Sequence, residues 1–358
     1  MRPIVLHGVA LGFVGALALL AASVGRPAHA EDVTFAGKSV NLTIGFAAGG
    51  GVDLYGRTLS KHLAQKLPGG PSVVVFNKPG AGGVVALNDW AMRAEPNGLN
   101  VTVGAQSQTD PDALSRTKAK FDPATFKIVG GLGAYSQGVF IRKEAVPRLT
   151  DKSAPPVVMG MVGSTLRGGT YQVLWGASFL GWNVKWVVGY QSTGEVRQAL
   201  ERGEIDMATF GATKDFDYIM KTGKVTVISQ TGQVQDGKRV KRPILGDAPI
   251  FSDMVRDKIK EPEARSAFSY WEDVSQIGMW VALPAGTPDP IVATYVKAFE
   301  AATGDPVFQS EYAKIDPDSI KATKADIERQ IGALAKVSPE TLKYLEDALR
   351  RQGFTAGQ

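Results

Sequence analysis

The 358-residue sequence predicts an α/β fold with two lobes and a ligand cleft between them. Strand-like runs such as "VNLTIGF", "SVVVF" and "VKWVVGY" alternate with helix-like runs, and this alternation is typical of α/β proteins with mostly parallel sheets. The chain is long enough for two hydrophobic cores, which favours two domains. Two stretches that break the alternation separate the lobes, and α/β proteins commonly bind ligands in such clefts.

The elements follow one another along the whole chain. Strands are predicted for "VNLTIGF", "SVVVF", "NVTVGA", "PPVVMGMVG", "VKWVVGY", "IDMATF" and "KVTVISQ", and helices for 52–67, 83–94, 169–180, 193–202, 288–302, 323–336 and 338–351. The periodicity breaks near 132–156 and again near 238–251, where prolines and turn residues gather. We therefore place one lobe at 31–136 plus 242–358, and the other at 137–241.

The first thirty residues have the pattern of a secretory leader. Arg2 precedes the uncharged run "VALGFVGALALLAASVG", and "AHA" at Ala28–Ala30 is a small-x-small cleavage pattern. The apolar run is short for a membrane span, and no stop-transfer pattern follows it. We expect export with cleavage after Ala30, so residues 1–30 are a signal peptide.

The composition excludes several kinds of site. The chain has no cysteine, which removes thiol catalysis and thiolate metal ligands. Two of its three histidines, His7 and His29, lie in the leader, so His62 is left, on the amphipathic helix 52–67. A Ser-His-Asp triad or a histidine-rich metal site therefore has almost nothing to be built from. The mild positive charge is spread along the chain, so we expect no nucleic acid partner. We also expect a monomer with no metal and no cofactor.

The stretch "IGFAAGGGVD" joins a strand to a helix through three glycines. Glycine permits close backbone approach, and the following helix start presents unpaired N–H groups with a partial positive charge. The stretch thus predicts an anion site made from the main chain. A P-loop and a dinucleotide fingerprint both fail, since no Gly-Lys-Ser/Thr follows and Leu54 stands where a third glycine belongs. Asp53 either supports the helix start or contacts the ligand.

Four more glycine-rich or polar loops follow strands: "NKPGAGG", "GAQSQTDP", "GMVGSTLRGG" and "GYQSTGEV". In the last, Ser192 and Glu195 have the spacing of a capping box, which gives Ser192 a local role. Because loops of one character follow strands in both lobes, we expect them to meet at one cleft.

The ordered motifs resemble the periplasmic solute receptors of tripartite tricarboxylate transporters, also called Bug receptors. The resemblance is carried by "IGFAAGGGVD", "VVVFNKPGAGG", "GYQSTGEVRQALERGEIDMATFG" and "WVALPAGTPDPIVATYVKAF", and it covers nearly the whole chain after the leader. It implies a two-lobed periplasmic-binding-protein (Venus-flytrap) fold. It also implies a periplasmic receptor that captures a small organic acid and delivers it to the permease subunits of such a transporter.

The resemblance further implies that backbone amides and hydroxyl groups from both lobes hold a ligand carboxylate. By position, the ligand-binding residues would be Phe46, Ala47, Gly49, Gly50, Asp53, Ser164, Thr165, Tyr190, Ser192, Thr193 and Gly194. Gln106 and Ser107, which replace a serine-rich run of the family, and Arg167, which replaces a small hydroxyl residue, are predicted ligand-binding residues as well. Arg167 is either a solvated residue on the first turn of a helix, or it holds a second carboxylate through two parallel N–H bonds. The segment 253–276 is longer than its counterpart in the family, and the sequence assigns it no role.

Two other functions compete with transport. A receptor that presents its ligand to a sensory membrane kinase would have the same sequence features. An exported hydrolase or isomerase would need two acids that converge on the cleft, whereas the loops hold only scattered ones such as Asp53 and Asp110. We therefore expect no enzymatic activity. Dicarboxylate, tricarboxylate, aromatic acid and amino acid ligands all remain open.

Overall fold

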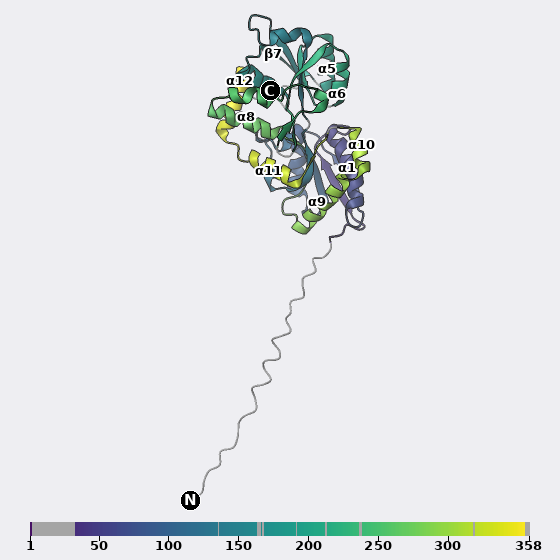
Figure 1. The fold of residues 1–358 in the computed structure, drawn as a ribbon. Helices are drawn as coiled ribbons and strands as arrows, with labels where there is room; N and C mark the ends of the chain where they lie inside the picture. Colours follow the sequence, from purple (N-terminus) through teal and green to yellow (C-terminus); the bar gives the residue numbers. More distant parts are fainter. Residues whose placement is uncertain are drawn as a thin grey trace.

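The computed structural model describes Met1 and residues 33–354, apart from 135, 163–165, 167, 191, 212, 236–237 and 318. Apart from Met1, the predicted signal peptide and its cleavage site lie outside the described residues. The chain forms two α/β lobes, which Figure 1 shows one above the other. Among the described residues, no helix has the length and apolar character needed to cross a bilayer. The predicted two-lobed α/β fold is confirmed.

The first lobe is built on a six-stranded sheet with the order β13-β4-β12-β3-β1-β2. Its strands are β1 (Ser39–Ile44), β2 (Ser72–Asn77), β3 (Asn100–Ala105), β4 (Lys127–Gly133), β12 (Ile277–Leu283) and β13 (Lys321–Ala322). β1 pairs parallel with both β2 and β3, as the alternation predicts. However, β12 runs antiparallel between β3 and β4, and β13 is antiparallel to β4. The sheet is therefore mixed: β12, which returns from the other lobe, and β13, which follows α10, both run opposite to β4.

Helices cover both faces of this sheet. They are α1 (Gly51–Lys66), α2 (Val84–Arg93), α3 (Pro111–Arg116), α9 (Asp289–Thr303), α10 (Pro306–Ala313) and α11 (Lys324–Leu334). On one face, α1 packs against α9 and α10, and Tyr55, Leu59 and Tyr295 are fully buried there. On the other face, α11 contacts β4. Leu87 and Trp90 of α2 belong to a separate hydrophobic cluster on that face, together with Trp280 of β12. The strands thus lie between two apolar layers, as expected for an α/β sheet.

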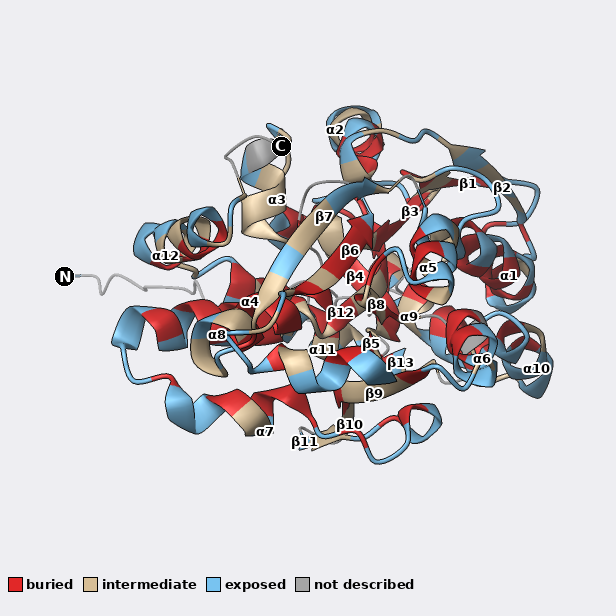
Figure 2. Cartoon of the chain, turned by 90° about the horizontal axis from the view of Figure 1, so that it is seen from above, coloured by how far each residue is buried: buried red, intermediate tan, exposed pale blue. Residues whose placement is uncertain are grey.

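The second lobe is built on a five-stranded sheet with the order β7-β6-β8-β5-β9. Its strands are β5 (Gly138–Arg142), β6 (Val157–Val162), β7 (Val184–Tyr190), β8 (Met207–Phe210) and β9 (Val225–Gln230). Its helices are α4 (Thr170–Phe179), α5 (Thr193–Arg202) and α6 (Thr213–Lys221). After β9, the strands β10 (Gln233–Gln235) and β11 (Lys238–Val240) form a small hairpin. In Figure 2 the buried strands of both sheets occupy the centre, and exposed positions lie on the outer helices.

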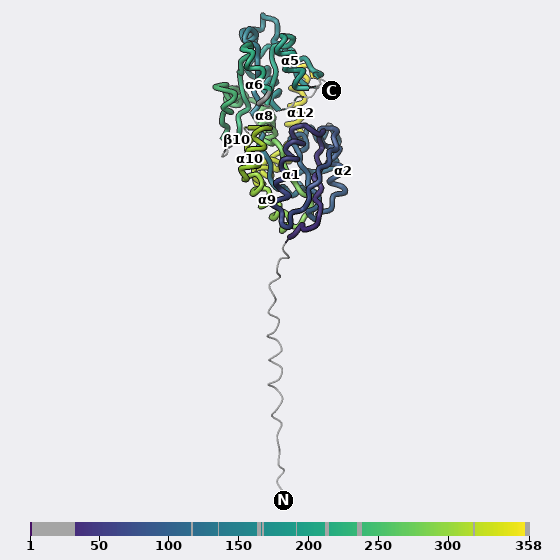
Figure 3. Tube along the Cα trace, turned by 90° about the vertical axis from the view of Figure 1, so that its right-hand side faces the viewer, coloured from purple at the N-terminus to yellow at the C-terminus, as the bar shows by residue number. Residues whose placement is uncertain are grey.

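The chain crosses between the lobes at 134–137, at 275–276, and between α11 and α12 (Pro339–Arg351). Two further helices, α7 (Phe251–Val255) and α8 (Pro262–Val274), precede the second crossing. Helices α7 and α12 contact α4, α8 contacts α12 and α11, and Figures 1 and 3 show α8 and α12 beside the upper lobe. Short 3-10 turns lie at Ala81–Gly83, Gln106–Gln108, Pro123–Thr125, Lys143–Leu149, Pro243–Leu245 and Arg256–Lys258. The lobe boundaries at 136, 241 and 242 stay a prediction.

Candidate functional site

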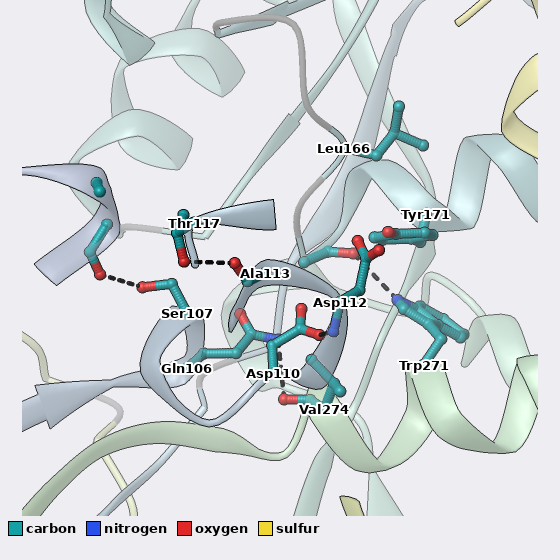
Figure 4. Close-up of a pocket in the computed structure, with 13 residues that line it drawn as sticks. Gln106, Ser107, Asp110, Asp112, Ala113, Thr117, Leu166, Tyr171, Trp271 and Val274 are labelled. Atoms are coloured by element: carbon teal, nitrogen blue, oxygen red, sulfur yellow. Dashed lines mark hydrogen bonds between the residues drawn. The ribbon is translucent and has the colours of Figure 1, made fainter. Parts of the chain in front are cut away.

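A cavity of about 200 Å³ lies where the two lobes and α8 meet (Figure 4). Its walls come from the loops after β2 and β3, from the loop before α4, and from α8. The lining residues are Ala81, Gly82, Gln106, Ser107, Asp110, Asp112, Ala113, Thr117, Leu166, Gly168, Tyr171, Trp271 and Val274. The cavity thus draws on loops of both lobes: the described lining includes residues of three predicted loops, "NKPGAGG", "GAQSQTDP" and "GMVGSTLRGG".

Gln106 and Ser107 are the two predicted site residues among the described lining. The Gln106 Nε2 donates to the Val274 carbonyl at 2.8 Å, and the Ser107 Oγ donates to the Gly82 carbonyl at 2.8 Å. Each side chain therefore binds the loop or helix that forms the neighbouring wall. Their direct contact with a ligand stays a prediction.

The loop after β2 requires glycine where it approaches Ser107. Gly82 has a φ of +64°, and a Cβ on it would lie 3.4 Å from both the Cβ and the Oγ of Ser107. A side chain at this position would be strained by the backbone conformation and would lie in contact with Ser107. The "PGAGG" motif thus places main-chain atoms, in place of side chains, beside the cavity.

Asp110 connects the lining to α8. Its carboxylate accepts the Asp112 N–H at 3.0 Å at the start of α3, and the Tyr270 hydroxyl donates to the same oxygen. Burial raises the pKa of Asp110 above its ordinary value, although the bond from Tyr270 opposes that rise. The pKa of the Tyr270 hydroxyl is raised as well, first by burial and then by the neighbouring carboxylate. The contact between Tyr270 and Asp110 therefore holds α8 against the first lobe.

α8 forms a third wall that the sequence did not predict. Trp271 is 4% exposed, and its Nε1 donates to the Gly168 carbonyl at 3.2 Å. Its ring packs against Phe268 and Phe251, with ring centroids 5.2 and 5.9 Å away. Figure 4 shows the Trp271 ring facing the cavity below Tyr171. The segment 253–276, left without a role by its sequence, therefore closes one side of the cavity.

The first glycine loop lies before α1, and its acid is engaged within the lobe. The Asp53 carboxylate accepts the Gly49 N–H at 2.8 Å, the Arg57 Nε at 2.9 Å and the Asn77 Nδ2 at 2.8 Å. Burial opposes the charge on this carboxylate, but the bonds from Arg57, Gly49 and Asn77 together hold the pKa of Asp53 below its usual value. Asp53 thus supports the loop and the helix start, and its contact with a ligand stays a prediction.

The other predicted residues of this loop are exposed or half-buried. Asn77 Nδ2 donates to the Phe46 carbonyl at 2.9 Å, and the Gly50 N–H donates to the Ala47 carbonyl at 3.3 Å. Gly49 has a φ of +79°, in the left-handed region. The described lining of the cavity does not include these residues. The Phe46 ring nevertheless lies 3.1 Å from where a Cβ on Gly83 would be, so this loop adjoins the cavity wall.

The last predicted loop, "GYQSTGEV", contains the N-cap of α5. Tyr190 ends β7, Ser192 accepts the Glu195 N–H at 3.2 Å as the N-cap of α5, and Thr193 and Gly194 begin that helix. These residues are absent from the described cavity lining, and their role as ligand contacts stays a prediction. The remaining predicted residues, Ser164, Thr165 and Arg167, lie outside the described residues.

Sequence reasoning missed Tyr171, Trp271, Val274 and Thr117. The apolar spacing of α8, with Ala264, Phe268 and Trp271 on one face, indicates a buried face but not what it faces. Within the described ranges, no group of three or more His, Cys, Asp or Glu side chains is placed to hold a metal ion.

Two α/β lobes joined by crossing segments, with a cavity where they meet, define the two-lobed periplasmic-binding-protein fold. No protein-family model matches the chain. Similar solved structures include a TctC solute binding protein from Polaromonas, which is 17% identical with a TM-score of 0.63 and covers 89% of this chain and 100% of that one.

Two further solved structures have the same fold. The periplasmic binding protein BugD is 22% identical with a TM-score of 0.55, over 88% of this chain and 98% of that one. An R. palustris protein solved with adipate is 19% identical with a TM-score of 0.59, over 88% of this chain and 98% of that one. The resemblance to TctC and Bug solute-binding proteins is thereby confirmed at the level of the fold.

A sequence relative adds a local match. The "UPF0065 protein in gbd 5'region" of Cupriavidus necator is 32% identical over 137 residues, which is 38% of this chain. The match spans 40% of that relative's length, less than half of it.

Proposed function

We propose that the chain is a periplasmic receptor that binds a small organic acid between its lobes and delivers it to a tripartite tricarboxylate-type permease. The observation that carries this proposal is the cavity itself, which loops of both lobes and α8 line together. Ligand binding between lobes suits a receptor, because closure around the ligand changes the surface that a partner meets. The fold of the TctC and Bug proteins supports the same function.

The expected ligand class rests on the first glycine loop, which adjoins the cavity wall through Phe46 and is not part of the described lining. α1 begins after Gly50 with no side-chain cap, so the first N–H groups of that helix remain for an anion. The neighbour solved with adipate holds a compound with two carboxyl groups, which fits the same chemistry. We infer that the chain binds its acid without chemical change, since the two carboxylates in the lining, Asp110 and Asp112, lie on one short helix start and not on opposite walls.

A thermal-shift screen of the chain from Glu31 onward against a carboxylate panel that includes adipate tests the proposal. A ligand at 100 times its Kd adds about 2.7 kcal/mol of stability, which is a readily measured shift. Ala113→Phe places a ring in the cavity without removing a hydrogen bond of a polar side chain, and it should abolish the shift. Ala124→Phe, at an exposed position on the same lobe, is the matched control and should keep the shift.

Two results would refute the receptor. If the acid is consumed at a rate that scales with protein concentration, and the activity is retained after the protein is purified again, the chain is an enzyme. A thermal shift that survives Ala113→Phe would place the ligand elsewhere. Delivery is checked by uptake of the bound acid into cells with and without the chain.

A further inference from the structure

The described lining of the cavity holds two acids and no base. Asp110 and Asp112 both line it (Figure 4), and the described lining contains no Lys, Arg or His. The receptor proposed above nevertheless takes an organic acid into this space. The ligand therefore brings a carboxylate close to two others, with no cation in the described lining to balance the charge.

Asp110 is held in place by hydrogen bonds to one of its two oxygens. Its Oδ1 accepts the Asp112 N–H at 3.0 Å, and the Tyr270 hydroxyl donates to the same oxygen. Because Oδ1 accepts both bonds, a proton on Asp110 would sit on Oδ2. A carboxylic acid with a proton on Oδ2 donates a hydrogen bond from that atom, whereas the ionised carboxylate only accepts.

The surroundings of Asp110 disfavour charge. Leu166, Trp271 and Val274 line the same cavity and are buried, so one side of the space is apolar. Burial is the first cause that raises the pKa of Asp110 above its ordinary value. Asp110 is therefore closer to the neutral form than an exposed aspartate even before a ligand enters.

Three titratable groups of the described chain face Asp110. On its own segment, Asp112 raises the pKa of Asp110 by like charge. On α8, the bond from Tyr270 lowers it, and so do the N–H groups of Asp112 and Ala113. On α4, Tyr171 lines the same cavity. None of the three is a cation that would keep Asp110 ionised beside a further carboxylate.

We propose that the receptor takes up one proton with its ligand, and that Asp110 carries this proton and donates a hydrogen bond from Oδ2 to the ligand carboxylate. The proposal rests on the proposed function, because it needs an organic acid in the cavity. A space of about 200 Å³ leaves a bound carboxylate close to Asp110. Two carboxylates that share such a site do not both stay ionised, so one pKa of the pair is strongly raised. The proton comes from the solvent.

The direction of the pH dependence follows from this uptake. Binding raises the pKa of Asp110, so the complex holds more protons than the free chain at any pH between the two pKa values. In that window the affinity rises as the pH falls, by up to about tenfold per pH unit for one proton. Outside the window, Asp110 contributes no pH dependence.

Isothermal titration tests the proposal. The probe is adipate or, where adipate gives no thermal shift, the acid of the panel that gives the largest one. The Kd is measured between about pH 6.5 and 8, where free carboxylic acids, with pKa values of about 4, are ionised. For the parent chain it should rise with pH, by up to about tenfold per unit. Titrations in two buffers of different ionisation enthalpy should show an uptake of up to about one proton per ligand.

Two variants isolate the proton on Asp110. Asp110→Asn cannot ionise, and asparagine caps a helix about as well as aspartate does. Its Kd should change by less than about twofold over the same pH range, with no proton taken up. The matched control is Asp122→Asn. Asp122 also caps a short turn before a proline, since it accepts the Ala124 N–H at 2.9 Å, but it is exposed and lies outside the described lining. This control should keep the pH dependence of the parent chain.

Three results would overturn the proposal and leave the receptor in place. A Kd that does not change with pH, with no proton taken up, would mean that Asp110 has the same charge in both states. A Kd that falls as the pH rises, with binding lost in Asp110→Asn, would mean that an ionised Asp110 holds a positively charged group of the ligand. Proton uptake that persists in Asp110→Asn and disappears in Asp112→Asn would assign the proton to Asp112.

A measurement on the parent chain decides the question even if Asp110→Asn fails to fold. The carboxyl carbon of Asp110 is titrated by NMR without and with the acid, and its midpoint should move up by about one pH unit or more in the complex. Equal midpoints would overturn the proposal. If no acid of the panel binds at any pH between about 5 and 8, the receptor and the proposal fail together.

Discussion

Asp53→Ala should destabilise the ligand-free chain, because the Asp53 carboxylate has three partners within its own lobe. The side chain is 2% exposed, so the loss of its charge-assisted bond to the Gly49 N–H is not compensated fully by water. Such a bond contributes about 1.5–3 kcal/mol. Arg57 is 46% exposed and re-forms bonds with water, so its share is discounted. We expect a loss of about 2 kcal/mol, and a fall in the melting temperature of roughly 3 °C for a cooperative chain of this length.

The pH dependence tests the physical cause. The folded pKa of Asp53 is lowered, so its contribution is present above the unfolded pKa of about 3.9 and is lost as the pH falls through the folded pKa. The difference in melting temperature between the parent and Asp53→Ala should therefore be constant from about pH 5 to 8 and should shrink below about pH 4. Calorimetry across this range measures it. Asp89→Ala, which removes a half-buried carboxylate paired with Lys78 and Arg93, is the control and should change the melting temperature by about 1 °C or less.

Two results would refute this reasoning. An unchanged melting temperature in Asp53→Ala would mean that the bonds are not formed in solution. If the difference in melting temperature between the parent and Asp53→Ala stays the same down to pH 2, the effect comes from the loss of side-chain packing and not from the loss of the negative charge. Asp53→Asn, which keeps the shape and one acceptor, should lie between the parent and Asp53→Ala.

Three further predictions concern other parts of the fold. Gly49→Ala should cost about 1–2 kcal/mol because the φ of Gly49 is +79°, whereas Gly50→Ala, at a φ of −77°, should be tolerated; urea unfolding of both compares them directly. Tyr270→Phe should lower the stability by about 1 kcal/mol and raise the pKa of Asp110 further, and a pH titration by NMR should detect that rise. Arg242→Met should destabilise the chain by about 3 kcal/mol or more, since this fully buried guanidinium donates to two main-chain carbonyls at 2.6 and 3.1 Å; soluble, fully cooperative Arg242→Met protein with parent stability would contradict this.

The parts of the fold that could be predicted are those that neighbouring residues determine. The strand before Gly49 and the helix after it follow from local periodicity and from the turn between them. Ser192 was expected to cap α5, and its Oγ accepts the Glu195 N–H because the two residues are three apart in one turn. Such contacts need no knowledge of the rest of the chain.

The parts that could not be predicted depend on contacts between distant segments. Nothing near Trp271 indicates that its indole nitrogen meets the Gly168 carbonyl, 103 positions away. β12 is antiparallel to β3 because the chain returns from the other lobe before it, and the residues of β12 themselves do not indicate this direction. The bond from Asn77 to Asp53 could not be predicted for the same reason, because Asn77 lies at the end of another strand.

α8 also bears on how selectivity could change in the proposed receptor. A space of about 200 Å³ holds roughly seven water molecules at the volume that water has in the liquid, which is below the usual range for drug-sized ligands. One helix, outside both sheets, supplies two of the residues that set this limit, Trp271 and Val274. Substitutions at these two positions would change the volume of the space without altering a residue of either sheet. The range of compounds that the cavity admits can therefore vary while the two sheets stay the same.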